Sequence, residues 1–250
     1  MDKQLLQRYF SQQRPPSWDC PNCDRGVLKS IEKFTVKSNS ETANNGGEEW
    51  WDVEYCKYVF SGMLICTTCQ EAVSIAGDGF ADREQYDDGS WGYETYLVPT
   101  YFNPPLNIVK LTVSDEVPEE IIRLLSKASE LFWCDADSAI NRLRSLVEII
   151  LDERGIPRKN KSNRLPLHHR ILLVADAELL DVRDALLAVK YIGNDSSHGF
   201  SGVGRNDLIT AFSIVKFCLE RLYPPVAVQS DIAKVIAGIN ANKGFVKKDL

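Results

Sequence analysis

Two stretches of this sequence decide its fold: Cys20-Pro21-Asn22-Cys23 and Cys66-Thr67-Thr68-Cys69. Each is a Cys-x-x-Cys knuckle, a turn tight enough for two thiolates to bind one metal ion. Together they offer four sulfur ligands, the closed tetrahedral set of a structural zinc site. Such a site leaves no coordination position for a substrate. The sequence therefore predicts one structural Zn²⁺ bound by these four cysteines, and a task that resides elsewhere in the chain.

The alternative for these cysteines is two buried thiol pairs or two disulfides. The first residues of the chain do not have the pattern of a secretory signal peptide. We therefore expect a reducing, cytoplasmic compartment, in which disulfides are rare. This expectation favours the metal site.

The 42 residues between the knuckles are expected to form an elongated β-hairpin. Both Val27–Lys37 and Trp50–Ile65 are rich in β-branched and aromatic residues, which is typical of strands. Between them, Ser38–Glu49 is polar and contains the asparagines and glycines of a turn. The second strand leads directly to Cys66. The first module is therefore predicted to be a zinc ribbon built on this hairpin.

The composition is that of an ordinary globular protein. The 250 residues are 44% hydrophobic and 26% charged, and no apolar run approaches the ~20 residues of a membrane span. The formal net charge of −6 argues against a chain that is basic throughout and binds nucleic acid with its whole surface. A local basic patch is compatible with this charge. We expect a cytoplasmic protein without a membrane partner.

The hydrophobic pattern changes from strand-like to helical along the chain. Residues 1–97 carry the zinc ribbon and short strands, with an acidic loop or ragged hairpin end at Gly77–Gly92. A proline-rich connector, 98–117, follows, because adjacent prolines disfavour helix. From Pro118 apolar residues recur with helical spacing, which predicts a bundle of about five helices over 118–250. The expected fold class is α+β, a β-rich zinc ribbon followed by an all-α bundle.

Two polar features of the predicted bundle stand out. Arg144 and Glu148 are four residues apart on one predicted helix, so they lie on the same face. They form either an ordinary helix ion pair or part of a site. Gly193 is expected to end a later helix in the left-handed conformation, so that Asn194 and His198 follow in a loop. We expect this turn to place Asn194 and His198 close to Arg144 and Glu148.

The order Arg-x-x-x-Glu, then Gly-Asn-x-x-x-His after a later helix, resembles bacterial domain-of-unknown-function family 4145. The matching residues are Arg144, Glu148, Gly193, Asn194 and His198. The resemblance covers about 99–223. Members occur alone, beside zinc ribbons and in restriction-enzyme subunits, and the family is placed in the HEPN superfamily of helical bundles. The resemblance implies a HEPN-like bundle, a setting of bacterial antiviral defence or restriction, and a homodimer formed through the bundle.

The HEPN superfamily includes many ribonucleases, whose active members carry an Arg-(four to six residues)-His motif after a helix. In this chain Gly193, not arginine, stands before Asn194. A metal-independent ribonuclease needs a base for the ribose 2′-hydroxyl and a cation for the phosphorane. His198 could be the base, and Arg144 would have to supply the cation beside Glu148. The candidate catalytic residues are Arg144, Glu148, Asn194 and His198. The glycine in place of the motif arginine, however, favours a structural role for Asn194 and His198. Endoribonuclease activity through His198 is the alternative.

A basic cluster lies between the second and third predicted helices. It comprises Arg154, Arg158, Lys159, Lys161 and Arg164. Such a cluster could follow a phosphate backbone, or it could be a solvated loop. The expected function is a non-catalytic or weakly catalytic nucleic-acid-associated module, with RNA, DNA or a defence or restriction protein as partner. A third possibility is an adaptor that docks a larger effector protein.

Overall fold

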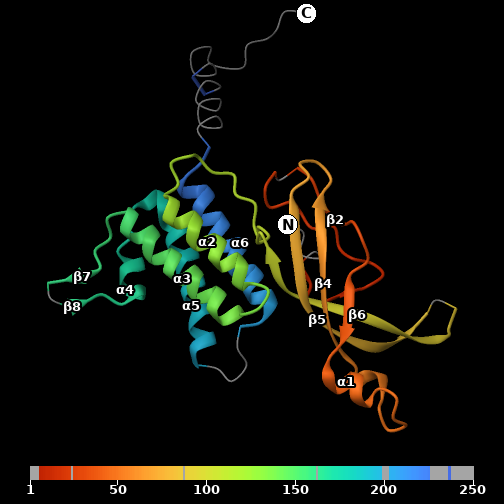
Figure 1. Cartoon of the computed structure of the whole chain (residues 1–250). Coiled ribbons are helices and arrows are strands. Elements are labelled where there is room, and N and C mark those ends of the chain that lie inside the picture. Colours follow the sequence, from red (N-terminus) through yellow and green to blue (C-terminus); the bar gives the residue numbers. More distant parts are fainter. Residues whose placement is uncertain are drawn as a thin grey trace, which may run out of the picture.

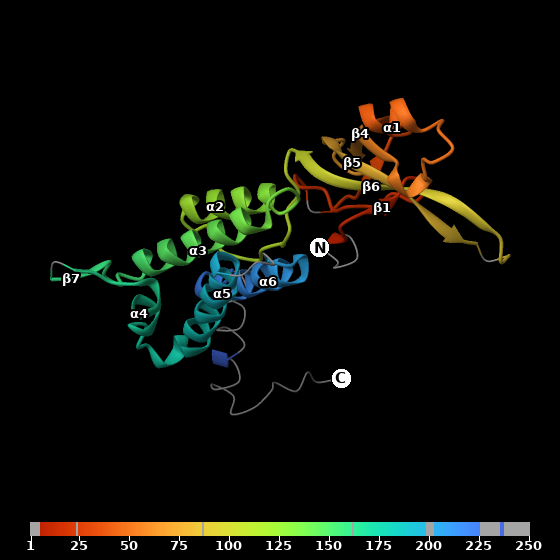
Figure 2. The same cartoon turned by 90° about the horizontal axis from the view of Figure 1, so that it is seen from below.

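The computed structural model describes residues 6–23, 25–86, 88–161, 163–198, 203–225 and 236–237, with only the backbone of 178 and 194–198. An antiparallel sheet and a group of helices follow one another along the chain and lie side by side (Figures 1 and 2). This is the expected order of a β-rich part and a helical part. Within the described ranges, no helix is both long enough and apolar enough to span a bilayer.

The first part is a six-stranded antiparallel sheet in the order β1-β6-β5-β4-β2, with β3 paired to β4 as well. Its strands are β1 (Phe10–Ser11), β2 (Leu28–Ser30), β3 (Thr35–Ser38), β4 (Lys57–Cys66), β5 (Ala72–Gln85) and β6 (Trp91–Asn103). The two longest strands, β5 and β6, form a hairpin that extends beyond the other strands (Figure 1).

The predicted hairpin between the two knuckles is present. Both β2 and β3 pair antiparallel with β4, and Leu28 lies opposite Cys66. The tip, however, is no simple turn: it contains α1 (Ser40–Asn45) and a 3₁₀ turn, η2 (Val53–Tyr55). The side chain of Asn39 accepts a hydrogen bond of 2.9 Å from the amide of Thr42, which caps the first turn of α1.

The acidic stretch Gly77–Gly92 was predicted to be a loop or a ragged hairpin end; it does contain the end of a hairpin, which Tyr86 and Ser90 close, but the hairpin is regular and the loop is wrong. Most of it belongs to β5 and β6, which pair in register to Gln85↔Trp91. A Cβ atom at Gly77 would lie 2.1 Å from the carbonyl oxygen of Val98. This glycine therefore allows the strands to approach closely, and it does not mark a turn. β6 also continues to Asn103, into the segment predicted to be a connector.

The second part is helical. Its elements are α2 (Glu119–Leu131), α3 (Ala136–Glu153), α4 (Leu167–Leu172), a 3₁₀ turn η3 (Ala177–Leu179), α5 (Leu180–His198) and α6 (Arg205–Leu222). A small hairpin of β7 (Lys159–Asn160) and β8 (Asn163–Arg164) separates α3 from α4. α3 is central, because it packs against α2, α4, α5 and α6. Its buried stripe includes Ile140, Leu143 and Val147, as the helical period of the sequence predicts.

Gly193 does not end a helix, contrary to the prediction, because α5 continues through it to His198. Within the described ranges the glycines with positive φ are Gly89 and Gly155. A Cβ atom at Gly193 would lie 2.3 Å from Cδ of Arg144. The absence of a side chain thus makes room for an arginine of α3, and it does not reverse the chain.

The sheet and the helices share one hydrophobic core. The ring of Phe102 lies 5.3 Å from that of Trp18 and 4.8 Å from that of Trp133, measured between centroids. Arg205 lies over the ring of Trp133 at 4.6 Å and donates a hydrogen bond of 2.8 Å to the carbonyl oxygen of Leu6. The sheet is therefore packed directly on the helices.

Candidate metal centre and arginine cleft

The two knuckles meet in one cluster of four cysteines. The sulfur atoms of Cys20, Cys23, Cys66 and Cys69 all lie within 4.8 Å of one another. Cys20 Sγ is 3.6 Å from Cys69 Sγ, and Cys23 Sγ is 3.7 Å from Cys66 Sγ. A tetrahedral set with metal–sulfur bonds of about 2.3 Å has sulfur–sulfur edges of about 3.8 Å. The cluster could therefore hold one metal ion, as the sequence predicts.

Backbone amides of both knuckles point at the sulfur atoms. The amide of Asn22 lies 3.4 Å from Cys20 Sγ. The amides of Thr68 and Cys69 lie 3.3 and 3.4 Å from Cys66 Sγ. Such N–H···S contacts stabilise thiolates, the form in which cysteine binds a metal. The turn that follows each first cysteine thus prepares that cysteine as a ligand.

The thiols differ in how readily they ionise. The amides of Arg25 and Gly26 lower the pKa of Cys23 to about 6, and the amide of Cys69 lowers that of Cys66. Burial raises the pKa of Cys20 to about 12, so this thiol becomes a ligand when a metal displaces its proton. Metal binding is therefore coupled to proton release.

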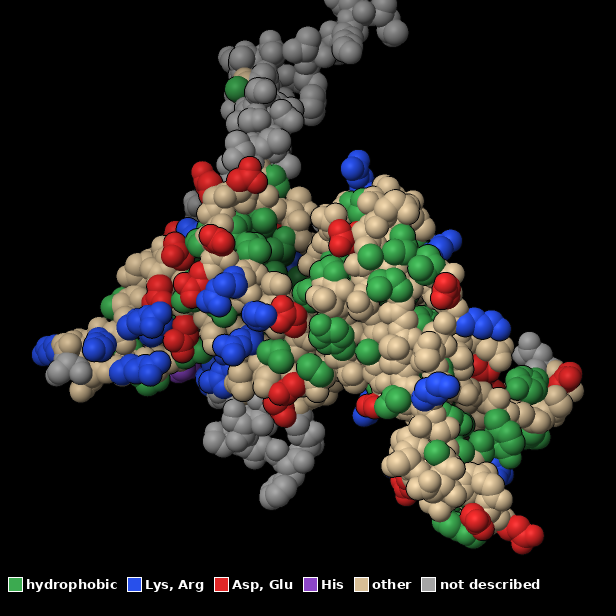
Figure 3. Space-filling view, in the orientation of Figure 1, with side chains coloured by type: hydrophobic (Ala, Val, Ile, Leu, Met, Phe, Trp, Pro, Cys, Tyr) green, Lys and Arg blue, Asp and Glu red, His purple; other side chains and the backbone are tan. Residues whose placement is uncertain are grey.

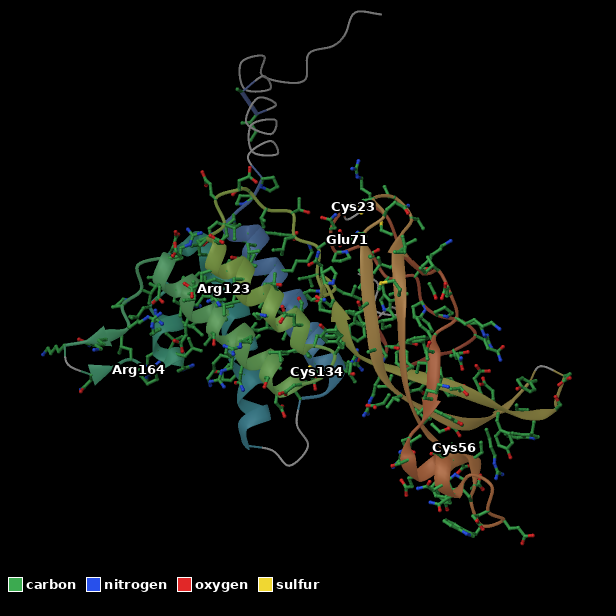
Figure 4. The ribbon with its side chains drawn as sticks, viewed as in Figure 1. Cys23, Cys56, Glu71, Arg123, Cys134 and Arg164 are labelled. Carbon is green, nitrogen blue, oxygen red and sulfur yellow. The ribbon has the colours of Figure 1, made fainter. Side chains whose placement is uncertain are left out.

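The sheet positions the cluster at the end nearest the helices. Cys66 is the last residue of β4, and its amide donates a hydrogen bond of 2.9 Å to the carbonyl oxygen of Glu71 at the start of the next strand. Cys23 and Glu71 lie close together at this end of the sheet (Figure 4). The side chain of Asn107 donates a hydrogen bond of 3.0 Å to the carbonyl oxygen of Pro21. The first knuckle is thus joined to the segment that leads into the helices.

We expect Gly26→Ala to weaken the cysteine cluster. A Cβ atom at Gly26 would lie 2.4 Å from Cys66 Sγ and 2.8 Å from Thr68 Oγ1. One methyl group too many in a packed site costs about 1–3 kcal/mol. Thermal unfolding and metal content of the purified variant would measure the effect. Gly47→Ala is the matched control, because a Cβ atom there meets nothing within 4 Å; equal losses in both variants would contradict the prediction.

A cleft of about 320 Å³ lies between α3, the β7–β8 hairpin and α4. It is lined by Arg144, Glu148, Arg158, Arg164, Leu165, Pro166, Leu167 and Arg170. Four of these side chains are arginines and one is a carboxylate. Figure 3 shows Lys and Arg side chains gathered at this end of the helical part, with acidic side chains between them. The cleft unites residues that the sequence assigned to two separate features.

Of the two alternatives for Arg144 and Glu148, the ordinary helix ion pair does not form between the described side chains. Glu148 instead lies 3.8 Å from Arg164, and Nη1 of Arg144 donates a hydrogen bond of 3.1 Å to the carbonyl oxygen of Gly193. The close approach of α5 at Gly193 draws Arg144 toward that carbonyl. The charge of Arg144 is therefore not neutralised by Glu148.

Two of the cleft arginines, Arg158 and Arg170, share the carboxylate of Asp152, which does not itself line the cleft. Arg158 donates to both carboxylate oxygens of Asp152, from Nε and from Nη2, and Nη2 of Arg170 lies 2.6 Å from the same carboxylate. The hydrogen bonds from Arg158, followed by those from Arg170, lower the pKa of Asp152. Arg170 is only 2% exposed, and none of the sequence patterns identified it as a site residue. The available signal is a charged residue beside Ile171 in a helix whose other positions are apolar or histidine.

The remaining members of the predicted basic cluster lie elsewhere. Arg154 turns to the end of α6, where it lies 5.3 Å from the ring centroid of Tyr223 and donates to the carbonyl oxygen of Leu222 at 3.0 Å. Lys159 and Lys161 are exposed on the β7–β8 hairpin and do not line the cleft. The cluster therefore divides into a structural arginine, two hairpin lysines and two cleft arginines.

The side chains of Asn194 and His198 lie outside the described residues, so their predicted contacts stay predictions. Their backbone belongs to α5. Gly193, which precedes Asn194, contacts Arg144. The position of His198 is five residues farther on, about 7.5 Å along the helix axis and about 140° around it. Helix packing thus brings Gly193 to Arg144 without the predicted turn, and the approach of Asn194 and His198 stays a prediction.

Two family models match the chain, and neither has an assigned function. Residues 8–102 match a domain of unknown function, DUF8608, and residues 126–241 match another, DUF4145. The second match confirms the resemblance drawn from the Arg-x-x-x-Glu and Gly-Asn-x-x-x-His pattern. Searches of the curated proteins and of the solved structures return no match. The sheet with its cysteine cluster is thus similar to one family, and the helices with the arginine cleft are similar to the other.

Proposed function

We propose that this protein is a non-catalytic or weakly catalytic nucleic-acid-associated module of bacterial antiviral defence or restriction. In this proposal a zinc-ribbon sheet supports a HEPN-like bundle, and the arginine cleft of the bundle binds the phosphates of RNA or DNA. One observation carries it: Arg144, Arg158, Arg164 and Arg170 line one cleft, in which Glu148 is the only carboxylate among the described lining residues.

The charge of the cleft is opposite to that of the whole chain. The formal net charge of the protein is −6, whereas the four cleft arginines outnumber Glu148 and the nearby Asp152. Arg164 is 78% exposed along its side chain, so it can reach a ligand without being withdrawn from the core. Guanidinium groups bind phosphate oxygens through paired N–H donors. The cleft therefore fits a polyanion better than a cationic or apolar ligand.

We propose zinc as the metal of the cysteine cluster. Four thiolates in tetrahedral arrangement are typical of zinc or of iron–sulfur chemistry. A pair of Cys-x-x-Cys knuckles without a further ligand is the usual donor set of a structural zinc site. The metal would hold the sheet together, and its filled coordination shell would leave binding to the arginine cleft.

One observation favours binding over catalysis. Gly193, at the position where active HEPN members carry arginine, lies inside α5 and contacts Arg144. The endoribonuclease alternative requires RNA cleavage that depends on His198.

We expect Arg164→Ala to weaken the binding of single-stranded RNA about tenfold. The loss follows because one charge-assisted contact to phosphate contributes about 1.5 kcal/mol. Fluorescence anisotropy of a labelled RNA measures the affinity. Arg123→Ala is the matched control, since Arg123 is an exposed arginine of α2, paired with Glu120 and outside the cleft (Figure 4).

Equal affinities of the two variants would contradict the assignment of the cleft. Failure of the wild-type protein to bind either RNA or DNA would favour the adaptor alternative. Cleavage of the RNA by the wild-type protein, abolished by His198→Ala with the fold intact, would favour the endoribonuclease.

A further inference from the structure

The distal part of the β5–β6 hairpin has no neighbouring strand on either side within the described residues. The pairing of β4 with β5 ends at Lys57↔Phe80, and that of β1 with β6 ends at Ser11↔Tyr96. Residues 81–85 and 91–95 therefore form a two-stranded ribbon, which we call the distal ribbon. Figures 1 and 2 show it projecting away from the helices.

The distal ribbon presents an open hydrogen-bonding edge along β6. The amide of Tyr86 donates to the carbonyl oxygen of Ser90 at 2.8 Å, which closes the hairpin. Hydrogen-bonding groups alternate along an antiparallel strand, so the N–H and C=O of Trp91 and Tyr93 point away from β5. The carbonyl of Thr95, next in this series, accepts a hydrogen bond of 2.9 Å from Gln12. Beyond that contact, no described strand pairs with this edge.

This open edge carries exposed aromatic side chains. Trp91 is 69% exposed and Tyr93 is 57% exposed. With Arg83 and Gly92 they line a pocket of about 450 Å³. Figure 3 shows hydrophobic side chains gathered on the projecting ribbon. Proteins usually protect an edge strand with charged side chains, proline or a bulge, because a free edge pairs with other chains. Aromatic side chains on a free edge are instead typical of a binding surface.

The charge around the distal ribbon is acidic. Between Ala81 and Thr95 the sequence has the carboxylates Asp82, Glu84, Asp87, Asp88 and Glu94, and its only cation is Arg83. Glu94 is buried and accepts a hydrogen bond from Ser11, so the other described carboxylates supply the acidic surface. Arg83 is itself paired, at 3.1 Å with Asp52 and at 3.4 Å with Glu54, both from the η2 region. A nucleic acid would be repelled by this surface. The same repulsion would oppose a second copy of the chain that brought its own ribbon to this edge.

We propose that the distal ribbon docks an extended, basic segment of a partner protein. The segment adds a strand to β6, so that its backbone pairs with Trp91 and Tyr93. Alternate side chains of the segment contact the two aromatic rings, and its lysine or arginine side chains approach the surrounding carboxylates. This site is separate from the arginine cleft and does not depend on nucleic-acid binding.

Synthetic peptides of about ten residues test the proposal on the full-length protein. The test peptide is a labelled Lys-Val repeat, which is basic and can form a strand. A Lys-Pro repeat has the same charge but lacks alternate N–H donors, so it is the control for backbone pairing. A Glu-Val repeat is acidic and is the control for charge. We expect the Lys-Val peptide to bind at least tenfold more tightly than the other two, measured by fluorescence anisotropy. Amide hydrogen exchange should slow at Trp91 and Tyr93 when it binds.

Two substitutions separate backbone pairing from ring contacts. Tyr93→Pro removes the outward N–H, and proline is tolerated at such an edge position; we expect binding to be lost. Tyr93→Thr keeps that N–H and removes the ring, and we expect a weaker loss of about threefold to tenfold. Affinity for RNA should be unchanged in both variants.

The proposal is overturned if the Lys-Val and Lys-Pro peptides bind equally, or if no peptide binds. It is also overturned if amide protection appears away from β6, or if the protein self-associates through this edge. The exchange measurement on the wild-type protein decides the matter even where Tyr93→Pro does not fold.

Discussion

Removal of the metal is expected to unfold the sheet. The cysteine cluster joins the first knuckle to the end of β4. Structural zinc binding supplies roughly 10–16 kcal/mol to the folding of small modules, which equals or exceeds the whole stability of a typical domain. A strong chelator should therefore abolish the cooperative thermal transition of the sheet, as followed by circular dichroism in the β region.

Substitution of one ligand should have the same effect. We expect Cys66→Ser to lose the metal, as measured by elemental analysis, and to lose the folded sheet with it. Cys134→Ser is the control, because Cys134 is exposed and lies outside the cluster (Figure 4). A sheet that melts at the wild-type temperature after complete metal removal would show that its core alone holds it together.

Arg170→Met is expected to lower the free energy of unfolding by about 3 kcal/mol, the lower end of the range for breaking a buried ion pair. Arg170 donates to the carbonyl oxygens of Ile156 and Pro157 at 3.0 and 3.2 Å and lies 2.6 Å from Asp152. All three acceptors lose a donor in the variant. Asp152 still accepts hydrogen bonds from Arg158 in the variant, so its charge stays paired and the loss of stability should be at the lower end of that range.

Urea unfolding of the metal-bound protein measures this loss. In Arg123→Ala, the exposed pair with Glu120 is removed, and about 0.5 kcal/mol or less should be lost. A change of that small size in Arg170→Met would contradict a structural role for Arg170. The variant should also weaken RNA binding, because Arg170 lines the cleft and holds the segment that leads from α3 into the β7–β8 hairpin.

The cysteine cluster could be predicted from sequence because its signal is local. Each knuckle is complete within four residues, and two such knuckles are a common ligand set for one metal ion. The strands that bring Cys20 and Cys66 together are also visible as β-branched runs. The tip of the hairpin was missed because a six-residue helix gives little periodicity, although Asn39 is a typical N-cap.

The roles of the glycines could not be predicted, because they depend on residues distant in sequence. Gly77 is required by the carbonyl of Val98, and Gly193 by the side chain of Arg144. In the sequence each looks like a turn or a helix terminator, which is the usual role of glycine. Gly155, by contrast, follows α3 with a positive φ of 69°, as its position predicts.

The cleft could be predicted only in pieces. Arg144 and Glu148 were identified from their helical spacing, and Arg158 and Arg164 from a local run of charge. Their meeting in one cleft depends on the path of the β7–β8 hairpin back over α3, which no local pattern specifies. The same path of the hairpin places Arg164, and not Arg144, beside Glu148.

The central claim, that the arginine cleft binds nucleic-acid phosphates, is tested most directly by the salt dependence of RNA binding. Each phosphate contact to a single strand contributes about 0.7 to the slope of log affinity against log salt concentration. We predict that Arg164→Ala lowers this slope by about 0.7 relative to the wild-type protein, and that Arg123→Ala leaves it unchanged. Equal slopes in the wild-type protein and in Arg164→Ala would contradict the claim.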